Sequence, residues 1–148
     1  VYSRCMSQEK IGPQDWDKLD WEETPYPGVS LIKVLEELNS ENPNIPSLSM
    51  FLLRVAPGAQ IPRHIHKREP EWRDQVVFGN SGTFEVLREG GSEIISNRSL
   101  IVEIGPYEIF GLKNLDNRPL LFTSSMKPGF TGYQEIEEIR EQDAGFQA

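Results

Sequence analysis

The stretch PGAQIPRHIHKREPEWRDQVVFGNSGTFEVL, residues 57–87, contains both histidines of this 148-residue chain, His64 and His66. They lie two positions apart, in a context that indicates a strand, a turn and a second strand. Side chains two apart on a strand point to the same face, so the two imidazoles are expected to converge on one small volume. A metal ion is the commonest physical reason for placing two imidazoles together in this way.

Composition limits the classes of function that remain. The length suits a single domain with one core, and the formal net charge of −8 argues against nucleic acid or anionic lipid as a partner. No apolar run approaches the length of a membrane span, and the N-terminus lacks the pattern of a secretory signal. Cys5 is the only cysteine, so no internal disulfide can form, which fits a cytoplasmic location.

The chain divides into three parts that we expect to form one domain. Residues 1–24 are polar and are predicted to form an arm that Trp16 and Trp21 anchor on the domain. Residues 25–130 carry the strand patterns of a barrel, and residues 131–148 are predicted to form a short C-terminal helix and a tail.

Short strands separated by Gly/Pro turns favour an all-β sandwich or barrel. Residues 30–38 fit either a helix face or a strand that bends near Glu36, and the strand is favoured. Residues 75–87 are interpreted as two strands joined by a turn at residues 79–82. In YQEIEEIREQ, residues 133–142, Tyr133, Ile136 and Ile139 form a stripe three apart, which predicts a narrow amphipathic helix. Further strands are predicted at 48–58, 99–104, 110–112 and 120–125.

The motif around the histidines resembles the first motif of the cupins, which are small jelly-roll barrels. Gly58 is followed by five residues, then by His64-Ile65-His66, then by four residues and Glu71. The resemblance covers roughly residues 25–128 and is greatest to the cupins related to anti-sigma factors and to small dioxygenases. It implies an all-β jelly-roll barrel, also called a double-stranded β-helix, with His64, His66 and Glu71 as metal ligands.

The downstream part of the first motif departs from the family pattern. Aligning VVFGNSGTFEV on the usual strand, turn and strand places Asn80 at the motif glycine. Counting back from Asn80 then places Arg73 at the acid position. Two alternatives follow: Glu71 is the ligand and the loop has an insertion, or the acid is replaced and Asp74 or Gln75 serves nearby.

The second cupin motif normally contributes a third histidine. IGPYEIFGLKN, residues 104–114, matches its frame, with Asn114 at the asparagine. The histidine position falls on Phe110, or on Gly111 in the neighbouring register, and neither residue can bind a metal. Glu108, two residues before Phe110, is a candidate for a substitute ligand on the same face of the strand.

Two histidines and one carboxylate suit Fe(II), and they also suit Mn, Ni or Zn. We therefore expect a divalent metal ion, a small-molecule ligand and, from the resemblance, a homodimer. Arginines flank the motif, and one of them, for example Arg54, could grip a carboxylate ligand, although charged side chains are mostly exposed. The leading hypothesis is a metal-dependent oxygenase or isomerase. The alternatives are a non-catalytic ligand-binding or sensing module with a degenerate metal site, and a scaffold used in assembly.

Overall fold

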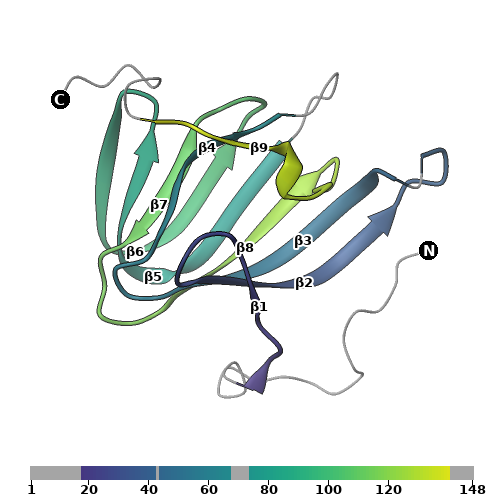
Figure 1. Cartoon of the computed structure of the whole chain (residues 1–148). Helices are drawn as coiled ribbons and strands as arrows, with labels where there is room; N and C mark the ends of the chain where they lie inside the picture. Colours follow the sequence, from purple (N-terminus) through teal and green to yellow (C-terminus); the bar gives the residue numbers. More distant parts are fainter. Residues whose placement is uncertain (1–17, 43, 68–73, 141–148) are drawn as a thin grey trace.

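The computed structural model describes residues 18–42, 44–67 and 74–140, and the regular structure in these ranges is almost entirely β-strand (Figure 1). In chain order the elements are β1 (Glu22–Glu23), β2 (Val29–Leu38), β3 (Pro46–Val55), β4 (Gln60–His66), β5 (Asp74–Arg88), β6 (Gly91–Ile104), β7 (Phe110–Asn114), β8 (Leu120–Lys127), the 3₁₀ turn η2 (Tyr133–Glu135) and β9 (Ile136–Glu138). No helix in these ranges is long and apolar enough to span a membrane.

All the strand pairings are antiparallel, in the order β1-β2-β3-β8-β5-β7-β4-β9, with β6 paired to β5 outside this path. The core lies on the inward face of the strands, because alternate residues point to opposite faces. On β8, for example, Leu120, Phe122, Ser124 and Met126 are buried, and the residues between them are less buried. The all-β prediction is therefore confirmed.

Strand β5 passes from one part of the sheet to the other. Its first half, residues 74–79, pairs with β8, and residues 84–87 pair with β7. The predicted turn at residues 79–82 is therefore wrong, because the chain continues through it as one strand. The ladder to β6 is irregular here, with register shifts between Phe78 and Ser81 and between Gly82 and Phe84. Irregular pairing of this kind lets a strand bend without ending.

The C-terminal segment also differs from the prediction. In place of a helix over 133–142, the chain makes the single turn η2 and then forms β9. Strand β9 pairs with β4, where Ile136 lies opposite His66 and Glu138 lies opposite His64. Pairing with β4 satisfies the backbone N–H and C=O groups of this segment, and a short helix with only three apolar residues would gain less stability. The contact continues beyond the strand, where the N–H of Ile139 donates to the carbonyl of Arg63.

The expected N-terminal arm is not supported. Its first 17 residues, with Cys5 and Trp16, lie outside the described residues. Its last residues form β1, which pairs with β2. Trp21 lies under the guanidinium group of Arg54, whose Cζ atom is 4.4 Å from the ring centroid.

Strand β2 follows the strand alternative for residues 30–38. Its pairing with β3 shifts between Lys33 and Leu35 and again between Glu37 and Leu38. These irregularities flank the bend expected near Glu36.

Candidate functional site

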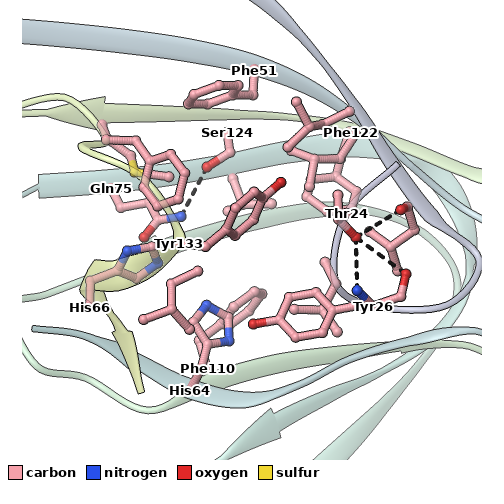
Figure 2. Close-up of a pocket in the computed structure, with 18 residues that line it drawn as sticks. Thr24, Tyr26, Phe51, His64, His66, Gln75, Phe110, Phe122, Ser124 and Tyr133 are labelled. Carbon is pink, nitrogen blue, oxygen red and sulfur yellow. Dashed lines mark hydrogen bonds between the residues drawn. The ribbon is translucent and has the colours of Figure 1, made fainter. Parts of the chain in front are cut away.

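A cavity of about 70 Å³ lies among the strands. It is lined by residues of β2, β3, β4, β5, β7, β8 and β9, and of the segments between β1 and β2 and between β8 and β9. Figure 2 shows side chains from these elements pointing into one space, among them His64, His66, Gln75 and Phe110. A volume of this size can hold a few water molecules or a small organic molecule. Both histidines therefore line one cavity, as their spacing predicts.

His64 lies in the buried part of this wall and is 7% exposed. Its Nδ1 atom is 2.8 Å from the carbonyl oxygen of Pro62. A carbonyl only accepts hydrogen bonds, so Nδ1 carries the proton and Nε2 of the neutral ring carries the lone pair. Burial lowers the pKa of His64 to about 4, and the charge of His66 adds to this effect, while the bond to Pro62 opposes it. His64 is therefore neutral at pH 7, the state in which an imidazole binds a metal.

His66 is held by a carboxylate from the far end of the chain. Its Nδ1 atom lies 2.7 Å from Oε2 of Glu135, which is 3% exposed. The other oxygen of Glu135 accepts hydrogen bonds from the backbone N–H and the hydroxyl of Thr131, both at 2.8 Å. With Nδ1 donating to a carboxylate, the lone pair of a neutral His66 ring also lies on Nε2.

The two rings therefore have the same arrangement. Their centroids are 5.1 Å apart at an interplanar angle of 63°, and each Nδ1 is bonded to an acceptor. Hydrogen bonding of one ring nitrogen to a carbonyl or carboxylate is the usual way in which proteins orient a metal-binding histidine. The donor set among the described residues is incomplete, because none of them form a group of three or more His, Cys, Asp or Glu side chains that could hold an ion.

Gln75 is the polar group that β5 contributes to the cavity. It is buried, and its Nε2 atom donates to Oγ of Ser124 on β8 at 2.9 Å (Figure 2). The amide oxygen is thereby left as an acceptor. Gln75 was one of the alternatives for the missing acid, and its side chain does line the cavity.

Phe110 occupies the place expected for the third histidine. It pairs with His64 across β4 and β7, lines the cavity, and its ring centroid lies 6.5 Å from that of His64. The alternative register, with Gly111 facing the site, does not fit. A Cβ atom on Gly111 would meet the backbone of Ile61 and Arg63 at 2.8 and 2.9 Å.

The structure gives no position for two of the other predicted side chains. Glu71 lies outside the described residues, and Asp74 is described only as the first residue of β5, opposite Lys127. Glu108 is not among the residues that line the cavity. Its exposed carboxylate accepts hydrogen bonds from Arg88 at 2.8 Å and from the N–H of Gly105 at 2.7 Å.

Arg54 does not line the cavity either, since its guanidinium group lies on Trp21.

Sequence reasoning missed the residue that orients His66. Glu135 lies within the segment predicted to be an amphipathic helix, outside its apolar stripe, but it is buried and bonded to the imidazole. Its partner lies 69 positions earlier in the chain, so no local pattern could have linked them. Tyr26 and Tyr133 also line the cavity, and burial raises the pKa of both phenols. Smaller contributions come from Glu138 and Tyr133 for Tyr26, and from Glu22 for Tyr133.

Comparison with known proteins identifies the fold. No family model matches the chain, and no curated protein matches it. Similar solved structures include KdgF from a Halomonas species, which is 22% identical, with 76% of this chain and 88% of KdgF covered and a TM-score of 0.54. An RmlC-like cupin from Shewanella frigidimarina is 16% identical, with 85% and 95% covered and a TM-score of 0.54. An oxalate oxidase in complex with the substrate analogue glycolate is 19% identical, with 78% and 57% covered and a TM-score of 0.54. The chain therefore has the cupin fold, a double-stranded β-helix, as its first motif predicts.

Proposed function

We propose that this protein is a small cupin that binds a divalent metal ion through Nε2 of His64 and of His66. In this proposal the ion acts together with the adjoining cavity on a small organic molecule, in a reaction of the oxygenase or isomerase type. Fe, Mn, Ni and Zn all suit such ligands.

One observation carries the proposal: both Nδ1 atoms are bonded to acceptors, so each neutral ring has its lone pair on Nε2. Two independent anchors, the Pro62 carbonyl and the Glu135 carboxylate, produce the same tautomer in neighbouring rings. Histidines that merely fill a core have no need of a common tautomer or a common cavity. The low pKa of His64 adds to the argument, because no proton has to be displaced at pH 7.

Glu71 is proposed as the third ligand, as its position in the motif implies. When bound, a divalent ion with open positions supplies Lewis acidity toward a carbonyl or enolate oxygen, or toward water or O₂. The residues of the chain would do the remaining work. Gln75 presents an acceptor to the bound molecule, and the apolar wall with Phe110 keeps bulk water away from it.

A second candidate function is a cupin that binds a small organic molecule without metal. The presence of Phe110 opposite His64, where the family motif has a histidine, favours it, because one imidazole ligand is lost. The expected homodimer belongs to either proposal. A native mass measurement that gives a monomer at micromolar concentration would contradict it.

Elemental analysis separates the two functions. The full chain is loaded with Zn, Ni, Mn or Fe(II), desalted and analysed, next to a variant with both His64→Ala and His66→Ala. We expect about one ion per chain in the natural protein and none in the double variant. Gln60→Ala, an exposed position on the same strand, is the matched control. An equal metal content in both folded proteins, or none in either, would refute the metal site.

A further inference from the structure

The walls of the cavity are aromatic on several sides. Besides the two histidines, six aromatic side chains line it: Tyr26, Phe51, Phe110, Phe122, Phe130 and Tyr133. Phe130 makes edge-to-face contacts with three of these rings. Its ring centroid lies 5.6 Å from that of Phe51, 5.6 Å from that of Tyr133 and 5.8 Å from that of His66. Such walls favour an apolar or aromatic ligand, because burying its surface and forming ring contacts with it both lower the free energy of binding.

The polar side chains of the cavity besides the histidines are Gln75 and Ser124, Thr24, and the two tyrosines Tyr26 and Tyr133. Gln75 lies beside Ser124, and Figure 2 shows its amide on the same side of the cavity as His66. At the other end, Thr24 is occupied by the backbone, because its hydroxyl donates to Val29 O at 2.8 Å and accepts from Tyr26 N. The amide of Gln75 is therefore the polar group that lies beside the histidines, and most of the remaining lining is aromatic or aliphatic.

Among the described residues, no lysine or arginine lines the cavity. Two of the flanking arginines act elsewhere. Arg63 donates to the carbonyls of Arg88 and Gly91, and Arg54 lies on Trp21. A carboxylate in the apolar part would lose its hydration without gaining a cation, which is strongly unfavourable.

We propose that the ligand is a small, largely apolar molecule, such as a single-ring phenol or enol, with one polar oxygen. Its hydroxyl group lies between Gln75 and the two histidines, where the amide oxygen of Gln75 accepts its hydrogen bond, and its apolar body lies against the aromatic walls. Dianions are excluded from the metal-free cavity, because no lysine or arginine among the described residues lines it. This inference rests on the proposed function only because both place the ligand in the same cavity. The apolar part of the ligand binds to the aromatic walls whether or not a metal is present.

The test compares three probes on the metal-free full chain by isothermal titration calorimetry: phenol, toluene and oxalate. We expect phenol to bind, toluene to bind about fivefold to tenfold more weakly because it lacks the hydroxyl, and oxalate not to bind. The variant Gln75→Leu should bind phenol about fivefold to tenfold more weakly and leave toluene unchanged. Gln60→Leu, on the exposed side of β4, should change neither affinity.

Several results would overturn the inference: oxalate binding as tightly as phenol, phenol failing to bind, or toluene losing as much affinity as phenol in the Gln75→Leu variant. If that variant does not fold, the comparison of phenol, toluene and oxalate on the natural chain still decides. The metal proposal fails separately, in the elemental analysis. A chain that binds phenol and holds no metal would refute the proposed metal site and leave the ligand class standing.

Discussion

Replacing Glu135 tests the link between the C-terminal segment and the histidine pair. The carboxylate is 3% exposed and accepts three hydrogen bonds, two from Thr131 and one from His66. Glu135→Leu removes both acceptor oxygens, so the N–H and hydroxyl of Thr131 and the imidazole N–H of His66 lose these three hydrogen bonds. A donor left without its acceptor in a buried position costs about 1–3 kcal/mol in the free energy of unfolding, so the loss of three such bonds should cost several kcal/mol.

Glu135→Gln has the same shape but only one accepting oxygen. Its NH₂ group must face either the N–H of Thr131 or the N–H of His66, so one donor is left opposite another. We expect a loss of about 1–3 kcal/mol in the free energy of unfolding. Because His66 then loses the partner that fixes its tautomer, zinc affinity should fall about 10-fold to 100-fold in both variants.

Urea unfolding of the metal-free protein at pH 8 measures the stability change, and competition with a chromophoric chelator measures zinc affinity. Glu137→Gln is the matched control, because Glu137 lies two residues away, is exposed and forms a surface ion pair with Lys67 at 2.9 Å. The free energy of unfolding of that variant should lie within about 0.5 kcal/mol of the value for the natural protein. The reasoning is refuted if Glu135→Leu is as stable as the control, or if it binds zinc as tightly.

Three further predictions concern the neighbouring residues. His64 has a pKa of about 4 when folded, because of burial first and the neighbouring imidazole second, against an ordinary value of 6.5 for histidine. As the pH falls, the unfolded chain therefore takes up the proton before the folded chain does. The stabilisation that comes from keeping His64 neutral is complete above pH 6.5, and about 3 kcal/mol of the free energy of unfolding is lost as the pH falls to 4. Urea unfolding of the metal-free protein should show this loss, and His64→Gln should lack it; equal pH slopes would contradict the assignment. Phe110→His places a third imidazole beside the pair and should raise zinc affinity at least about tenfold in the chelator assay, whereas an unchanged affinity would mean that this position does not face the ion. Gly111→Ala brings a Cβ within 2.8 Å of the Ile61 carbonyl and should cost about 1–3 kcal/mol in urea unfolding, and a neutral effect would show that the strands can separate there.

The strands could be predicted because their signals are local. Pro/Gly turns and apolar runs located most of them, and His64 and His66 share one cavity because a period of two is a property of any strand. The errors arose where the partner strand decided the outcome. Residues 133–142 have a stripe that fits a helix, but the unpaired edge of β4 offered backbone hydrogen bonds to Ile136–Glu138. Nothing within the segment itself shows that such an edge exists.

The site was predicted only in part for the same reason. Phe110 was placed correctly in the second motif, since the motif fixes its position next to His64. Glu108 was expected to lie on the same strand face as Phe110. The chain turns at residues 105–108 instead, and the carboxylate of Glu108 accepts a hydrogen bond from the N–H of Gly105. Glu135 and Gln75 take their roles from strands brought together by folding, and such contacts leave no pattern in the sequence.

The most direct measurement is ¹⁵N NMR of the two imidazoles at pH 8, first without metal and then with one equivalent of zinc. The account predicts that both metal-free rings have a protonated Nδ1 and an unprotonated Nε2, and that zinc shifts both Nε2 resonances until one ion is bound per chain. Rings protonated on Nε2, or Nε2 resonances that do not respond to zinc, would contradict it.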